Sequence, residues 1–173
     1  MTGQPLWFLG TLVRPKLTSA DTGGRLALWE GVLPHGAAPP LHTHPQDETF
    51  FVLEGELTVW LVERELADDR DGETGWLATR ARTCGPGAAV FAPGDSAHTF
   101  RVESDTARVL FLSTPAGIEG YVHALAEPAR WPWLQPPLDG PRVPLERLAA
   151  VEREHGVVRL SPPPPAAEPK EER

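Results

Sequence analysis

The middle of the chain is a series of short β-prone runs, each closed by a turn rich in Gly, Pro, Asp or Ser. The runs cover residues 48–53, 56–65, 76–83, 88–92, 98–103 and 107–114. No helical pattern alternates with them, so a parallel βαβ arrangement is excluded and an antiparallel one is favoured. Such strands protect their edges best when the sheet closes on itself. We therefore predict an all-β domain with a jelly-roll barrel.

The two ends of the chain complete this prediction. Runs rich in Trp, Leu and Val at 7–13 and 25–33 read as the first strands, separated by a loop at 18–24. Ile118, Val122 and Leu125 recur at helical spacing, and a second helix is expected between Pro144 and Gly156. We expect one domain over 1–160, with the barrel at about 6–114, a helical extension at about 115–160 and a Pro-rich disordered tail at 161–173.

Irregular structure is expected between the two helices. The segment 129–144 carries several prolines that deny a regular element, and Trp131, Trp133 and Leu134 are expected to dock it on the barrel. The acidic turn at 68–75 lacks the spaced ligands of a calcium loop, so it reads as a solvated hairpin tip.

Three residues that commonly bind metals lie within a few positions of one another. In the segment GAAPPLHTHPQDETFFVLEG, His42, His44 and Glu48 share the parity that an extended strand directs to one face. A later segment, GAAVFAPGDSAHTF, adds His98 after a Pro-Gly turn. Three imidazoles and one carboxylate suit a divalent first-row transition metal, and iron, manganese, nickel, cobalt, copper and zinc all stay open.

The spacing of these residues resembles the two motifs of the cupin superfamily. Gly36, His42, His44, Glu48 and Gly55 fit every position of the first motif. In the second motif Gly87, Pro93 and His98 fall in register, whereas Asp95 stands in place of a Gly and Val102 in place of the closing Asn. The resemblance implies a double-stranded β-helix barrel with His42, His44, Glu48 and His98 as metal ligands.

The order of the flanking segments is similar to bacterial single-domain cupins of the quercetinase-like group, over about residues 7–160. Quercetinases bind a flavonol through its enolate oxygen and insert dioxygen. The resemblance therefore implies a metal-dependent dioxygenase of a small aromatic or enolisable compound. Glu48 is expected to act first as a ligand and second as a catalytic base.

Two other functions stay open at this stage. The same ligands could support a non-redox isomerase, cyclase or decarboxylase, or a module that binds or senses a small molecule without turnover. If Glu48 faces inward, Phe50, Val52 and Phe100 share that face, as a substrate cavity wall or as plain core. His35, His123 and His155 have no ligand spacing and read as surface or packing residues.

Composition excludes several partners. The net charge is −8 and no Lys/Arg cluster interrupts the chain, so nucleic acid is not an expected partner. The first residues lack the features of a signal peptide, no stretch is long enough to span a membrane, and the lone Cys84 suits the reducing cytoplasm. Cys84 reads as a strand-end residue, not a nucleophile. A homodimer is expected, with the apolar strand at 7–13 as one surface that could pair.

Overall fold

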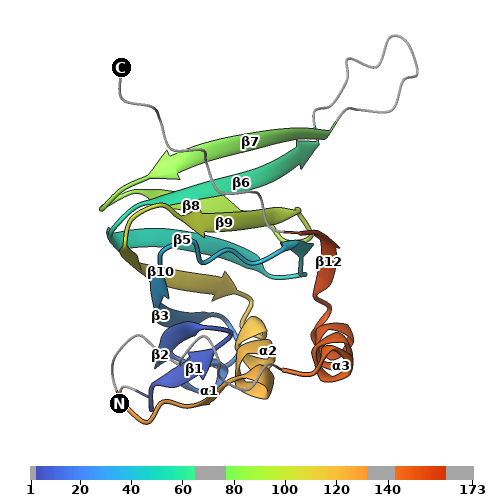
Figure 1. Ribbon diagram of the computed structural model, residues 1–173. Coiled ribbons are helices and arrows are strands. Elements are labelled where there is room, and N and C mark those ends of the chain that lie inside the picture. The colour runs from blue at the N-terminus through green and yellow to red at the C-terminus, as the bar shows by residue number, and fades with distance from the viewer. Residues whose placement is uncertain (1–2, 65–76, 132–142, 163–173) are drawn as a thin grey trace, which may run out of the picture.

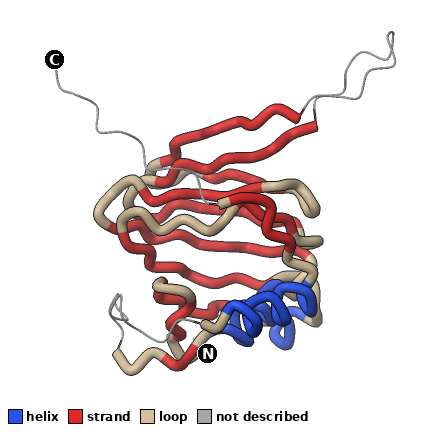
Figure 2. The backbone as a smooth tube through the Cα atoms, turned by 45° about the vertical axis from the view of Figure 1, so that its right-hand side comes forward, coloured by secondary structure: helices blue, strands red, loops and turns tan. Residues whose placement is uncertain are grey.

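The computed structural model describes residues 3–64, 77–131 and 143–162. Within these ranges every paired strand is antiparallel, and the strands form two sheets that stack as a sandwich (Figure 1). The helices gather at one end of this sandwich (Figure 2). The predicted all-β jelly-roll architecture is confirmed.

The larger sheet has seven strands. Their order across the sheet is β11 (Glu127–Pro128), β1 (Leu6–Phe8), β2 (Thr11–Leu17), β3 (Ala27–Pro34), β10 (Thr106–Thr114), β5 (Asp47–Glu54) and β8 (Ala89–Ala92). Strand β10 lies between β3 and β5 and shows a strict alternation of buried and partly exposed residues. This alternation gives the sheet one face toward the second sheet and one face away from it.

The smaller sheet has five strands. Their order is β12 (Val158–Ser161), β4 (Leu41–Thr43), β9 (His98–Val102), β6 (Leu57–Arg64) and β7 (Leu77–Cys84). Strands β6 and β7 pair antiparallel in register, which confirms the predicted hairpin. Its connecting loop lies outside the described residues. Cys84 ends β7 as a buried free thiol, in agreement with the strand-end prediction.

The expectation of a single strand at 7–13 is wrong, because the chain reverses within it. Leu9 and Gly10 both have positive φ, of 45° and 89°, and they join β1 to β2 as a hairpin. Two successive positive φ values match the twist of tight hairpins, so a two-residue turn is enough here. Sequence reasoning missed it because Leu is a rare residue in that conformation.

Three helices accompany the sheets. Helix α1 (Ser19–Thr22) lies within the predicted loop, where Thr18 and Asp21 form a capping box. Helices α2 (Ile118–Leu125) and α3 (Leu145–His155) match the predicted helices. Gly156 closes α3 with φ of 69°, the left-handed conformation that glycine adopts without strain.

The C-terminal extension contributes strands as well as helices. After α3 the chain forms β12, which pairs with β4 at the edge of the smaller sheet (Figure 1). In this pair Arg159 lies opposite His42. All four residues of β12 are exposed, so their short apolar–polar alternation marks no buried face, and the sequence analysis did not predict this strand.

Aromatic rings fill the space between the sheets. Phe50, Phe100 and Phe111 pack against one another with ring centroids 5.6–5.9 Å apart. Phe50 and Val52 are each 1% exposed. Both belong to the hydrophobic core, with Phe100 packed against it, so packing is one role that these three residues perform.

The segment that follows α2 was expected to dock through its large apolar residues. Trp131 packs edge-on against Trp7, with ring centroids 6.1 Å apart. Trp133 and Leu134 lie outside the described residues. No helix in the described part of the chain is both long and apolar enough to cross a membrane.

Candidate metal centre

The centre begins with a pair of histidines on neighbouring strands of the smaller sheet. His42 on β4 and His98 on β9 are direct cross-strand partners, and their ring centroids are 4.6 Å apart. Directly opposed residues on one face of an antiparallel pair bring their side chains together. This register carries the two imidazoles to one point although 56 positions separate them in sequence.

His44 joins this pair from just beyond β4. Its ring lies 5.6 Å from that of His42 and 4.9 Å from that of His98. One ring nitrogen from each of these three histidines falls within a group whose members all lie within 4.8 Å of one another. The spacing allows one metal ion to contact all three nitrogens.

Glu48 reaches the same point from the other sheet. Strand β4 of the smaller sheet ends at Thr43. Residues 44–46 form a link, and β5 then begins at Asp47 in the seven-stranded sheet. The prediction that one strand face carries both histidines and Glu48 is therefore wrong in its geometry. The residues meet because the chain crosses from one sheet to the other between them.

The carboxylate of Glu48 contacts two of the imidazoles. Its Oε2 atom lies 3.3 Å from His44 Nε2 and 3.3 Å from His98 Nε2. His44 and His98 are each 1% exposed and Glu48 is 7% exposed. The structure thus brings together all four side chains that the sequence proposed as ligands, in a largely buried position.

Carbonyl oxygens fix two of the imidazole rings. Nδ1–H of His42 donates to the Pro40 carbonyl at 2.8 Å, and Nδ1–H of His98 donates to the Ser96 carbonyl at 2.9 Å. A carbonyl can only accept, so the proton of each neutral ring is on Nδ1 and the lone pair is on Nε2. This is the usual way in which proteins orient histidines that bind metals.

The orientation of His98 tests whether a cation fits here. Its buried Nε2 has no hydrogen-bond partner and faces the Glu48 carboxylate. A lone pair opposite a carboxylate is unfavourable unless a proton or a metal ion lies between them. The donor set of three imidazoles and one carboxylate suits a divalent transition metal, so the residues fit the ion that the sequence predicted.

Burial and neighbouring charges shift the acidities in this cluster. Burial, reinforced by His98, lowers the pKa of His42 to about 4. Burial opposes ionisation of Glu48, but the contacts with His44 and His98 outweigh it and lower its pKa to about 2. Burial likewise opposes protonation of His98, yet the Glu48 carboxylate raises the pKa of this imidazole.

The second motif keeps its turn despite its departure at Asp95. Asp95 has φ of 60°, the left-handed conformation that a glycine would supply, and Asp is among the residues that tolerate it. Its backbone N–H donates to the His44 carbonyl at 2.8 Å. The turn therefore ties the His98 segment directly to the His44 segment.

A carboxylate that sequence reasoning missed supports the same turn. Asp47 Oδ1 accepts a hydrogen bond from Gly94 N at 2.7 Å. A side chain at Gly94 would collide with the Pro45 carbonyl oxygen. The second departure, Val102, is fully buried, and its backbone bonds to Gly36 and Ala37 at the start of the first motif.

The remaining histidines stay apart from the centre. His35 is exposed and donates to the Ser104 carbonyl, and His123 is exposed on α2. His155 packs against Tyr121 with ring centroids 6.4 Å apart. Their surface or packing roles are as predicted.

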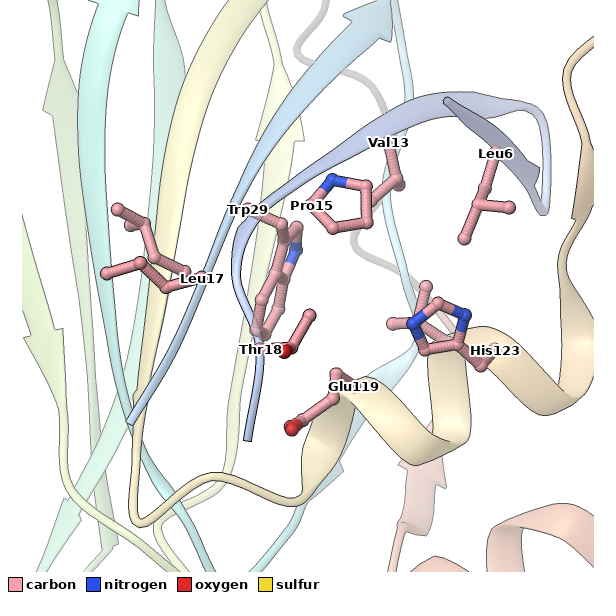
Figure 3. A pocket seen from close by; sticks show the side chains of 10 residues that line it. Leu6, Val13, Pro15, Leu17, Thr18, Trp29, Glu119 and His123 are labelled. Atoms are coloured by element: carbon pink, nitrogen blue, oxygen red, sulfur yellow. The ribbon is translucent and has the colours of Figure 1, made fainter. Parts of the chain in front are cut away.

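A small pocket lies elsewhere, between the N-terminal strands and α2 (Figure 3). Trp29, Glu119 and His123 are among its lining residues, and none of the four proposed ligands is. Glu119 is already occupied, since it accepts hydrogen bonds from the backbone of Ser19 and Gly117.

Comparison with known proteins agrees with the fold and the motifs. The cupin domain family model matches residues 29–115, half of the 173-residue chain. The match includes both motifs and all four proposed ligands. The chain belongs to the cupin family. No curated protein matches it.

Solved structures with a similar fold include two oxalate decarboxylases. The enzyme from Bacillus subtilis, studied for its Mn(II) centres, gives a TM-score of 0.52 at 20% identity over 66% of this chain and 28% of its own. The enzyme from Lactobacillus farciminis gives 0.51 at 15% identity over 67% of this chain and 34% of its own. The polyketide cyclase RemF from Streptomyces resistomycificus gives 0.46 at 25% identity over 62% of this chain and 66% of its own. This chain therefore spans about a third or less of the decarboxylases, and the likeness concerns the fold.

Proposed function

We propose that this protein binds one divalent transition metal ion through His42, His44, Glu48 and His98. The convergence of three imidazoles, two of them oriented by carbonyl oxygens, and one ionised carboxylate supports this ligand set. Four protein ligands leave about two positions of an octahedral ion open to small molecules. An open position distinguishes a catalytic from a purely structural metal site.

We propose further that the protein is a dioxygenase of a small aromatic or enolisable compound. A bound divalent ion supplies a Lewis acid for an enolate oxygen and, when it is redox-active, electrons for dioxygen. Next to the ligands, the ring of Phe50 lies 6.0 Å from that of His98 and 5.8 Å from that of Phe100. Such aromatic surroundings favour an apolar, planar substrate over a highly charged one.

Glu48 has two roles in this proposal. Its lowered pKa keeps it ionised at neutral pH, as a ligand requires. A carboxylate with so low a pKa is a weak base, so abstraction of a proton needs Glu48 to leave the imidazoles that stabilise its charge. Replacement by Gln tests this: a base role predicts that turnover falls more than metal content, and equal losses would leave Glu48 a ligand only.

The first experiment is elemental mass spectrometry on untagged protein, beside the double variant His42→Ala/His98→Ala. Near-stoichiometric metal in the wild type and none in the variant would support the ligand set. Oxygen uptake with flavonols and other enolisable aromatics then tests the reaction. Turnover that continues without dioxygen would instead indicate an isomerase, cyclase or decarboxylase, and binding without turnover would indicate a binding or sensing module.

We also propose that the protein forms a homodimer, but not through the N-terminal strand. Trp7 and Leu12 on that hairpin are already buried within the chain, at 8% and 0% exposure. Phe51 on β5 and Phe91 on β8 are exposed at 37% and 53%, on the face of the larger sheet that points away from the core. Exposed aromatic residues on adjacent strands of one sheet suit association with a second copy.

A reducing compartment such as the cytoplasm is the proposed location. Cys84 is buried at 2% exposure, and it is the single cysteine of the chain. A disulfide within the chain is thus excluded, so oxidising conditions offer the fold no stabilisation. Fractionation of cells that express the tagged protein tests the location.

A further inference from the structure

A serine in the barrel interior lies directly beside Glu48. Ser113 is on β10, where Val109, Phe111 and Ser113 alternate inward, and it is fully buried. In the pairing of β10 with β5, Ser113 is the direct partner of Glu48. Side chains in such a pair have Cβ atoms about 4.5–5.5 Å apart and face the same side of the sheet. The hydroxyl therefore belongs to the surroundings of the proposed metal centre.

This hydroxyl has no hydrogen-bond partner. Ser113 Oγ is buried and unpaired, although buried polar groups in native proteins are nearly always satisfied. Its other cross-strand neighbour is Ala27 on β3, and the neighbour of Glu48 on β8 is Ala92, each 0% exposed. Neither methyl group can bond to the hydroxyl. Along this row across the sheet, Glu48 is the one side chain that can accept a hydrogen bond from the Ser113 hydroxyl.

The partners of Glu48 depend on whether its neighbours bind metal. Without metal, Glu48 Oε2 contacts His44 and His98. Once the nitrogens of these imidazoles are ligands, their lone pairs are committed to the metal and they carry no proton to donate to the carboxylate. The carboxylate oxygen that is not a ligand then needs a new donor, because a buried carboxylate is stable only when it is hydrogen-bonded.

We infer that Ser113 is a positioning residue that holds Glu48 in its metal-binding orientation by donating a hydrogen bond to its carboxylate. The inference rests on the proposed metal ligands and names a group that neither cupin motif contains. A hydrogen bond to an ionised acceptor is stronger than a neutral one, which explains why a costly unpaired hydroxyl is retained here.

The experiment measures two quantities for each variant: the affinity for cobalt(II) alone, by calorimetry, and the thermal stability of the metal-free protein. Ser113→Ala is compared with wild type, with Glu48→Ala and with the double variant. Thr58→Val serves as the control, because it also removes a buried hydroxyl, one that pairs with Thr83 between β6 and β7. Loss of a hydrogen bond to a metal ligand typically weakens metal binding about 10–100-fold.

We expect Ser113→Ala to weaken cobalt binding at least about tenfold and to leave the metal-free protein as stable as wild type or more so. In the Glu48→Ala background the same change should have less than about a twofold effect. Thr58→Val should leave affinity unchanged. An unchanged affinity in Ser113→Ala, an equal loss in both backgrounds, or a destabilised metal-free variant would each overturn the inference while the metal site stands. No cobalt binding by wild type would overturn the proposed function and the inference together.

Discussion

Gly94 offers a direct test of how the metal centre is assembled. It lies in the turn before His98, where an added Cβ would collide with the carbonyl oxygen of Pro45, next to His44. Its backbone has no positive φ, so replacement by Ala introduces a steric collision and no conformational strain. The collision involves backbone on both sides, and it can be relieved only if the two segments move apart.

The size of the effect follows from what this movement breaks. Overpacking of this kind costs about 1–3 kcal/mol. Separation of the segments also stretches two hydrogen bonds, Gly94 N to Asp47 Oδ1 at 2.7 Å and Asp95 N to the His44 carbonyl at 2.8 Å. With about 1 kcal/mol for the weakened bonds, we expect Gly94→Ala to lose about 2–4 kcal/mol of stability. For a chain of this size that corresponds to a Tm lower by roughly 4–16 °C.

Metal binding should weaken in the same variant, because the turn sets the distance between His44 and His98. Urea unfolding and cobalt(II) calorimetry measure the two effects. Gly85→Ala is the matched control, since a Cβ there meets no atom within 4 Å and the residue lies in the connection that precedes β8. If Gly94→Ala unfolds within about 0.5 kcal/mol of Gly85→Ala, the close approach of the two motifs does not constrain the centre.

Three further results are expected. The Glu48 carboxylate raises the pKa of His98, so below that pKa a metal ion must displace a proton from this imidazole. The affinity for metal should therefore fall by about tenfold per pH unit as the pH drops below the pKa of His98. His42, with a pKa of about 4, adds nothing until far lower pH. Calorimetry in buffers of different ionisation enthalpy counts the proton, and a pH-independent affinity from about pH 5 to 8 would contradict this. Arg159→Ala leaves the buried Glu152 carboxylate without its ion pair at 2.8 Å. Because the Arg159 side chain is 39% exposed, we expect the free energy of unfolding in urea to fall by about 1–2 kcal/mol. Addition of Glu152→Gln should recover this stability, and no recovery would argue against the pair. Phe91→Lys should convert the proposed dimer to monomer in light scattering at unchanged Tm, and a dimer that persists would exclude this face.

Local chemistry accounts for much of the fold that the sequence predicted. The runs at 107–114 and 144–156 became β10 and α3 nearly as expected, because alternation, helical spacing and the terminal Gly156 act within a few residues. The left-handed turn between Leu9 and Gly10 and the strand β12 were missed. The turn carries no local signal, since Leu is unusual at positive φ, and β12 is a four-residue strand with no buried face that pairs with the edge of β4.

The candidate site likewise has one part that the sequence predicted and one part that only the tertiary structure decided. The motif spacing by itself predicted His42, His44, Glu48 and His98 as ligands, since a metal needs particular donor atoms and the motifs hold such residues at fixed intervals. Only the tertiary structure decided that they meet from two different sheets, because register between distant strands is set by long-range pairing. The same pairing places Ser113 beside Glu48, a contact across 65 positions that no local pattern encodes.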